Sequence, residues 1–372
     1  MQRMTRCMPL SAFLLFFLSS RRVTSLAVPE ALRLARGRLH EGLASPSGKL
    51  TLSPEIVVPE PKDATSILLQ ANALSNLSEK IRVQAKSNSA WISGSVSALQ
   101  TFCSEQEQAR GNFPGPVPVI YCDAKDADAI ESVAKSGAAG VLVRVDNGNE
   151  VSSLEDIPVG SDASWVQMST LALESGLQPI PEVTIGDSTA ATWGEDDITS
   201  LVGRLTNALS GEEPVSVLLT INPPIAADDD TEEEFEHQET SLPQVPKQLG
   251  KRVPILGSVR VPAGNNRIGS ETARFKDAGF TGCVLRSDCV PGFRMNPDLE
   301  FVGKFWSSCI GDLKSTKSKT FEFRTRNELD KLAPLEWMKY QKDVIDSGAL
   351  GSAEDNMPPP DLDESSGDYM GF

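Results

Sequence analysis

Short apolar runs alternate with amphipathic helical patterns along most of this 372-residue chain, and this alternation constrains its fold more than any single motif does. The order is typical of β/α units joined into a parallel sheet. It predicts strands at residues 55–58, 81–85, 117–121, 140–145, 163–167, 179–184, 216–221, 253–258 and 282–286. It predicts helices between most of them, at 63–79, 95–109, 126–136, 168–175, 195–210 and 269–278. We therefore expect an α/β protein with one closed (β/α)8 TIM barrel, because so many strands fit one barrel better than two open sheets.

The first 45 residues depart from this alternation and are expected to form a bipartite leader. The apolar stretch MPLSAFLLFFLSS at 8–20 lies between arginines, is too short to span a bilayer comfortably and is typical of a signal peptide. The basic stretch 28–50 resembles a transit peptide. We therefore expect import into a plastid, to the chloroplast stroma, and no stable membrane span once the leader is removed. Secretion is the alternative destination, and a first helix of the domain at 28–44 is the alternative structure.

The remainder of the chain divides into a barrel and two C-terminal segments. The barrel is expected to span residues 46–313 and to end in a helical pattern at 297–313. A helical extension at 314–350 follows, with its own pattern at 327–346. Residues 351–372 are acidic and Pro-rich, and we expect them to be a disordered tail.

The acidic net charge of the chain limits the classes of partner that it can bind. The formal net charge of −16 argues against nucleic-acid binding, because a phosphate backbone would be repelled and no basic stripe offsets the repulsion. Eight carboxylates lie in residues 226–241, directly after a predicted strand. This acidic segment and the C-terminal extension are candidate surfaces for a protein partner; a solvated loop is the alternative for the acidic segment. Only two histidines are present and the six cysteines form no CxxC pair, so we expect free thiols, no metal site and no cofactor.

Five stretches carry recognisable patterns at the predicted strand ends. They are WISGSVSAL (91–99), VPVIYCDAKDADAIESVAKSGAAGVLV (117–143), ALESGLQPIPEVTIGD (172–187), LLTINPP (218–224), and VPILGSVRVPAG (253–264) with FKDAGFTGCVLRSD (275–288). In their order and spacing they resemble indole-3-glycerol-phosphate synthase, a tryptophan-pathway enzyme that closes and decarboxylates an anilino-deoxyribulose phosphate to form the indole ring. The resemblance runs from about residue 50 to 290 and implies a ribulose-phosphate-binding barrel.

The resemblance assigns catalytic positions to this chain. Glu55, Glu182 and Asn222 match two functional glutamates and an asparagine of the family. Four other family positions are altered: Val57 and Cys122 replace lysines, the second of them a general acid, Pro224 replaces an arginine and Gly257 replaces a glutamate. A competing match at Gln84-Ala85-Lys86 would keep the first lysine but would delete a whole α/β unit.

The phosphate corner of the family falls on Ser258, Arg286 and Ser287. Ser258 matches a phosphate-binding serine, whereas Arg286 replaces a glycine whose backbone meets the phosphate. A guanidinium there could bind a phosphorylated small molecule through two hydrogen bonds. An ion pair with Asp288 is the alternative role of Arg286.

The altered positions bear on catalysis. A thiol is a shorter and poorer proton donor than a lysine with a lowered pKa, and loss of such an acid typically costs about 10²–10⁴ in rate. Cys122 also has no histidine base that would make it a nucleophile. The sequence therefore predicts a plastid barrel of the synthase type that has lost catalysis and keeps a binding, regulatory or assembly role. The alternative is an active synthase, a carboxy-lyase, or a related phosphosugar lyase or isomerase.

Overall fold

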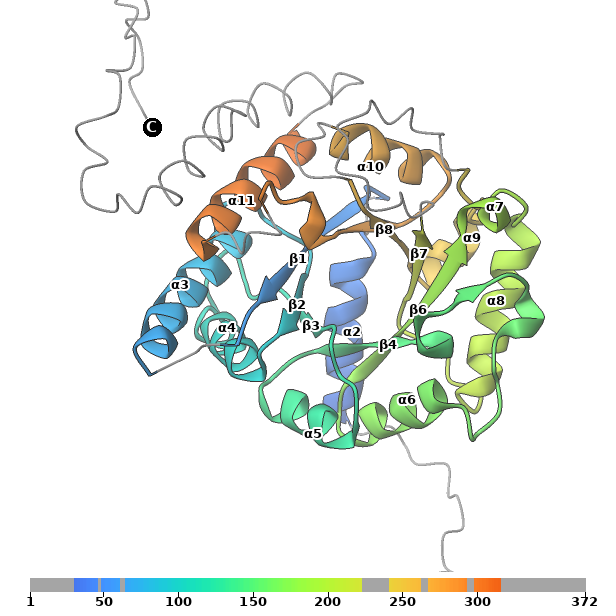
Figure 1. The fold of residues 1–372 in the computed structure, drawn as a ribbon, viewed down its shortest axis with the longest axis horizontal. Helices are drawn as coiled ribbons and strands as arrows, with labels where there is room; N and C mark the ends of the chain where they lie inside the picture. Colours follow the sequence, from blue (N-terminus) through green and yellow to red (C-terminus); the bar gives the residue numbers. More distant parts are fainter. Residues whose placement is uncertain are drawn as a thin grey trace, which may run out of the picture.

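The computed structural model describes residues 30–45, 48–60, 64–222, 241–261, 267–292 and 298–315. In this part of the chain eight strands form a ring: β1 (Thr51–Val58), β2 (Ala90–Gly94), β3 (Val119–Tyr121), β4 (Gly140–Arg144), β6 (Gln178–Gly186), β7 (Val217–Asn222), β8 (Ile255–Val259) and β9 (Gly282–Leu285). Each pairs in parallel with the next, and β9 pairs with β1 to close the ring. A short strand, β5 (Glu150–Val151), pairs with β6 beside it. The predicted (β/α)8 TIM barrel is confirmed (Figure 1).

Helices surround the ring of strands (Figure 1). They are α3 (Ala64–Val83), α4 (Val96–Gln108), α5 (Ala127–Lys135), α6 (Ser164–Glu174), α7 (Asp187–Ala190), α8 (Glu195–Ala208), α9 (Lys247–Arg252), α10 (Ile268–Asp277) and α11 (Leu299–Ser315), with 3-10 turns η1 (Val145–Gly148), η2 (Leu154–Asp156) and η3 (Ser287–Cys289). In α5, Asp126 caps the first turn by accepting the Ala129 N–H, and Gly137, at φ +86°, follows the last turn. Its Ile130 and Val133 are buried against the barrel.

Side chains on the barrel strands alternate between the helix layer and the interior. The interior at mid-height is apolar and is filled by Trp91, Ile120, Leu142, Ile180, Leu218, Leu256 and Val284. Two residues further along the same strands the side chains become polar, as at Ser93 on β2, Glu182 on β6 and Arg286 after β9. This change of polarity lies at the C-terminal end of the barrel, the face on which TIM-barrel enzymes carry their active sites.

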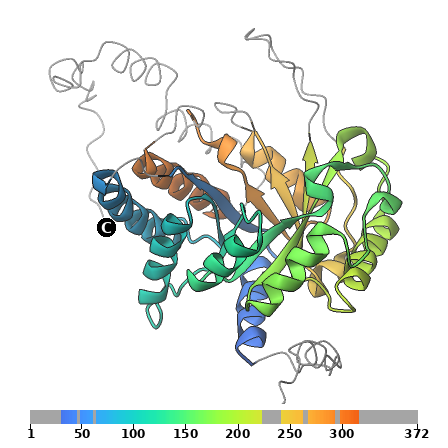
Figure 2. The same cartoon turned by 60° about the horizontal axis from the view of Figure 1, so that its bottom comes forward.

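A helix that precedes the barrel, α2 (Glu30–Leu43), plugs the opposite end (Figure 2). Its Leu39 and Leu43 are fully buried in the same apolar cluster as the barrel interior, and Arg36 donates to the backbone carbonyl of Glu213 before β7. The structure therefore corrects the predicted leader boundary at residue 45: this region is the alternative first helix. An arginine-rich amphipathic helix and a transit peptide share one sequence pattern, so the pattern alone does not distinguish them.

Two predicted strands are helical in the structure. Residues 81–85 lie at the end of α3 and in the turn after it, because Leu74 and Ile81 belong to one buried face at helical spacing. Residues 163–167 lie at the start of α6, where Trp165 is buried. The second barrel strand is β2 instead. Short apolar runs fit a strand and a buried helix segment equally well, and here the helix continues the neighbouring periodic face.

Several predicted features lie wholly or almost wholly outside the described residues. These are the signal-like stretch 8–20, the acidic segment 226–241, the helical pattern 327–346 and the tail 351–372. The predicted helix at 297–313 corresponds to α11. Within the described ranges, no helix is both long enough and apolar enough to cross a membrane.

Candidate functional site

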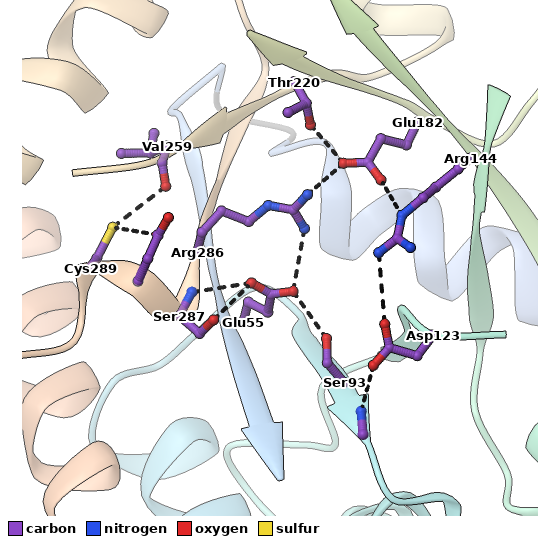
Figure 3. Close-up of polar contacts among 12 residues, drawn as sticks. Glu55, Ser93, Asp123, Arg144, Glu182, Thr220, Val259, Arg286, Ser287 and Cys289 are labelled. Atoms are coloured by element: carbon purple, nitrogen blue, oxygen red, sulfur yellow. Dashed lines mark hydrogen bonds and ion pairs between the residues drawn. The ribbon is translucent and has the colours of Figure 1, made fainter. Parts of the chain in front are cut away.

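A connected set of charged and polar side chains fills the C-terminal end of the barrel (Figure 3). Its members come from six strand ends: Glu55 on β1, Ser93 on β2, Arg144 on β4, Glu182 on β6, Thr220 on β7 and Arg286 after β9. Parallel strands in a closed barrel all end on one face, so residues far apart in sequence meet there. Glu55 and Arg286, separated by 231 positions, are in contact.

Arg286 lies at the centre of this set, between two glutamates. Its Nη2 donates to Glu182 Oε1 at 2.5 Å, and its Nη1 donates to Glu55 Oε1 at 3.4 Å. The three side chains are only 6%, 4% and 12% exposed for Arg286, Glu182 and Glu55. Buried charges require opposite charges and hydrogen bonds. The guanidinium therefore compensates both carboxylates at once.

Neutral donors contact the same two carboxylates. Thr220 Oγ1 donates to Glu182 Oε1 at 2.7 Å, and Ser93 Oγ donates to Glu55 Oε1 at 3.0 Å. The backbone N–H and the hydroxyl of Ser287 both donate to Glu55 Oε2, at 3.1 and 3.3 Å. Every oxygen of Glu55 thus accepts hydrogen bonds from the protein itself, as expected for a buried charged group.

A second arginine extends the ion pairs to the rim of the barrel. Arg144 Nε lies 3.3 Å from Glu182 Oε2, and its Nη2 lies 3.7 Å from Asp123 Oδ1. The other oxygen of Asp123 accepts the Gly94 N–H at 2.7 Å. Arg144 is 48% exposed, so its ion pairs contribute less stability than the buried pairs of Arg286.

Burial and charge act in opposite directions on Arg286. Burial acts to lower the pKa of its guanidinium, but the carboxylates of Glu55 and Glu182 outweigh it and the pKa is raised. Nearby Asp288 has a raised pKa, chiefly because it is buried. Arg286 therefore stays charged, and its charge is directed at the two glutamates.

Cys122 lies directly after β3, two residues past Ile120, with its side chain between the apolar barrel interior and the polar side chains of the mouth. It is 3% exposed, and burial, followed by the charge of Glu55, raises the pKa of its thiol well above the ordinary value. A thiol that stays protonated and shielded is a poor nucleophile and a poor general acid at neutral pH. Cys122 is therefore unsuited to either role.

We expect Cys122 to resist alkylation in the folded protein. Iodoacetamide reacts with thiolates, and burial keeps this thiol both protonated and inaccessible. Peptide mass spectrometry after a native pulse of reagent at neutral pH should find Cys122 unmodified, and the same pulse in urea should modify it. Rapid labelling of Cys122 in the folded protein would contradict its position inside the barrel.

The three predicted phosphate-binding residues lie on adjacent parts of the mouth, but two already donate to carboxylates. Arg286 donates to Glu55 and Glu182, rather than pairing with Asp288, and Ser287 donates to Glu55. The hydroxyl of Ser258 and the Nε of Arg286 are buried without a hydrogen-bond partner in the part of the chain that the structure describes. Phosphate binding by these residues stays a prediction.

The first-strand match places Glu55 and Val57 on β1, where both line the same cavity. The competing match, Gln84-Ala85-Lys86, lies in the turn after α3. Asn222 is the last residue of β7, but its side chain and Pro224 lie outside what the structure describes. At positions 55 and 57, β1 thus presents one carboxylate and one neutral side chain.

Position 257 faces the helix layer rather than the mouth. A Cβ at this position would lie 2.1 Å from Cδ1 of Phe275 on α10, which covers the outer side of β8. Because side chains alternate, the next residue, Ser258, is the one that faces inward. A glutamate at 257 would point away from Arg286 in the fold of this chain.

Sequence reasoning missed Ser93, Asp123, Arg144 and Thr220. Arg144 ends the apolar run GVLVR, and a charged residue at the last position of a barrel strand was the available signal. Thr220 lies two residues before Asn222, on the same side of β7. Both residues can therefore be identified as candidate site residues once the ends of the barrel strands are known.

No protein-family model and no curated protein sequence matches this chain. Solved structures resemble it distantly. A tryptophan synthase from M. tuberculosis is 11% identical over 74% of this chain and 96% of that chain, with a TM-score of 0.39. A structure described as native KDPGal is 12% identical over 70% and 96%, with a TM-score of 0.34, and methylornithine synthase is 10% identical over 70% and 77%, with a TM-score of 0.40. A functional assignment therefore rests on the barrel mouth.

Proposed function

We propose that this protein is a non-catalytic barrel of the indole-3-glycerol-phosphate synthase type, kept for a binding, regulatory or assembly role. One observation carries this proposal: Arg286 is held between Glu55 and Glu182, the two glutamates that match functional residues of the family. A general acid or base must be free to exchange a proton with the substrate. Both carboxylates are instead engaged by the guanidinium and by neutral donors.

The charge of the mouth supports the same proposal. The substrate of the family carries a phosphate and a carboxylate, so its site needs positive charge. Arg286 and Arg144 supply positive charge here, and both pair with acidic side chains. Arg260, directly after β8, adds positive charge beside Asp288. The two lysine positions of the family hold the neutral Val57 and Cys122. An anionic substrate would have to displace internal carboxylates, which opposes its binding.

One observation favours catalysis as a second candidate. Ser258 Oγ and Arg286 Nε are buried with unused hydrogen-bonding capacity among the described residues, and Ser258 matches the family's phosphate-binding serine. A phosphorylated small molecule bound there would lie beside Glu182. The chain would then be an active synthase, a carboxy-lyase, or a lyase or isomerase of a related phosphosugar that uses Glu55, Glu182 and Asn222.

Complementation of a bacterial tryptophan auxotroph that lacks the synthase tests the proposal. The expressed chain should begin at residue 28, so that α2 is retained and the signal-like stretch is removed. We expect no growth without tryptophan, although immunoblotting detects soluble protein. Growth equal to that of a strain carrying a true synthase would contradict the proposal and favour the second candidate.

We also propose that the protein acts in a plastid, in the chloroplast stroma. The support is the signal-like stretch at 8–20 and the arginine-rich sequence after it. Because that sequence forms α2 inside the barrel, a cleaved leader must end before Glu30. Imaging of the full chain fused to a fluorescent protein at its C-terminus separates this location from secretion. Fluorescence in the secretory pathway would contradict the plastid location.

A further inference from the structure

An apolar surface lies on the first helix of the barrel, beside the mouth. On α3, Ile67, Leu68 and Leu69 are 50%, 70% and 68% exposed. Consecutive helix residues point in different directions, so these three side chains spread apolar surface over a broad arc of α3. Single exposed apolar residues are ordinary, whereas contiguous apolar patches are typical of binding surfaces.

A groove runs from this surface between α3 and α11. Its upper part is a cavity of about 290 Å³ lined by Leu69 and Ala73 of α3 and by Leu299 and Val302 of α11. A second hollow continues along the same two helices and shares Ala73 and Leu299 with the first. The two hollows therefore form one groove, walled by the first and last helices of the barrel.

The polar groups of the upper cavity are already engaged. Glu55 accepts hydrogen bonds from Ser287 and Ser93, and Gln70 Nε2 donates to the Pro59 carbonyl at 2.8 Å. A polar small molecule would compete with these bonds, whereas an apolar side chain would only remove apolar surface from water. The upper cavity thus favours an apolar occupant.

The chain itself contains a segment of matching character. Residues 316–372 follow α11 and lie outside the described residues. The helical pattern at 327–346 contains Pro334, which a helix accepts best in its first turn, so we expect the helix at 334–346. Trp337, Tyr340 and Val344 then stand at i, i+3 and i+7, which places them on one face.

We propose that residues 334–346 dock into the groove between α3 and α11, with the face that carries Trp337 against Leu68 and Leu69. The tether is long enough, because the 17 residues of α11 span about 25 Å, whereas residues 316–333 can extend to about 60 Å. A tether of this kind holds the segment at an effective concentration on the order of millimolar. This advantage favours the chain's own segment over a second copy or a separate partner. Docking does not depend on whether the barrel is catalytic.

Tryptophan fluorescence of the full chain tests this docking. Of the five tryptophans, Trp91, Trp165, Trp193 and Trp306 are 0%, 2%, 6% and 0% exposed, so Trp337 is the reporter. Iodide stays out of protein interiors and should quench little of the emission of the unmodified chain. In the double variant Leu68→Glu/Leu69→Glu, one of the five tryptophans, Trp337, should become accessible to iodide. The substitutions are at exposed positions, so the barrel should keep its circular dichroism spectrum.

Two controls make the result specific. Val159→Glu replaces another exposed apolar residue, 42% exposed between η2 and α6, and should leave quenching unchanged. Adding Trp337→Phe to the double variant should remove the accessible emission. Equal quenching of the unmodified chain and the double variant would overturn the proposal. Analytical ultracentrifugation tests whether a second copy fills the groove instead. Dimers that dissociate both on dilution and in the double variant, with Trp337 becoming exposed to iodide on dilution, would assign the groove to a second copy. That result would also overturn the proposal.

Discussion

Replacing Arg286 by methionine is expected to lower the free energy of unfolding by about 3–5 kcal/mol, because two buried carboxylates lose their compensating charge. Arg286 is 6% exposed and contacts Glu55 and Glu182 directly. Methionine keeps a long, adaptable apolar side chain, so the loss should reflect charge more than an empty cavity. Urea unfolding followed by circular dichroism measures the change.

Arg252→Met is the matched control for this substitution. Arg252 Nε lies 2.9 Å from Glu213 Oε1, but its side chain is 62% exposed, and a surface pair of this kind contributes about 0–1 kcal/mol. Adding Glu55→Gln and Glu182→Gln to Arg286→Met should recover part of the lost stability, since the charges are then removed together. Equal stability of the two methionine variants would show that the buried ion pairs do not hold the mouth together.

Gly94→Ala is expected to cost about 2–5 kcal/mol, from backbone strain and a clash that no rotamer change relieves. Gly94 has φ +94°, and a Cβ there would lie 2.0 Å from the carbonyl oxygen of Val58 on the neighbouring strand. The Gly94 N–H also donates to Asp123, so a shift of this residue would loosen the outer part of the ion-pair set. Thermal and urea unfolding both report the loss.

Gly111→Ala separates the two causes. Gly111 has φ +89°, close to that of Gly94, but a Cβ there would meet nothing within 4 Å. Only the strain of the left-handed backbone remains, about 1 kcal/mol. Equal decreases in the free energy of unfolding for Gly94→Ala and Gly111→Ala would show that the close approach to Val58 is not the reason why position 94 requires glycine.

The barrel could be predicted because its strands and helices repeat one pattern. The wrongly predicted elements lie where the local sequence pattern and the tertiary packing favour different structures. The run at 81–85 has strand-like composition, but Ile81 completes a buried helical face that begins further back in α3. The plug α2 has an arginine-rich sequence that resembles a targeting segment. Its role becomes visible only when Leu39 and Leu43 are seen inside the barrel.

The candidate site was predictable in position but not in its pairing. Strand-end reasoning brought Glu55, Glu182 and Arg286 to one face, because all parallel strands end there. That the guanidinium lies between the two glutamates depends on side-chain conformations that no local pattern encodes. Arg286 was therefore expected either to bind a phosphate or to pair with Asp288, and its actual contacts are with the glutamates.

Turnover of the anilino-deoxyribulose phosphate by the purified chain from residue 28 tests most directly whether the mouth is closed by its own ion pairs. Fluorescence of the indole product follows the reaction. Glu182→Gln provides the background, because an active synthase would use the Glu182 carboxylate in catalysis. We predict that the unmodified protein gives no rate above that of the variant. A rate above background that Glu182→Gln abolishes would contradict the non-catalytic barrel.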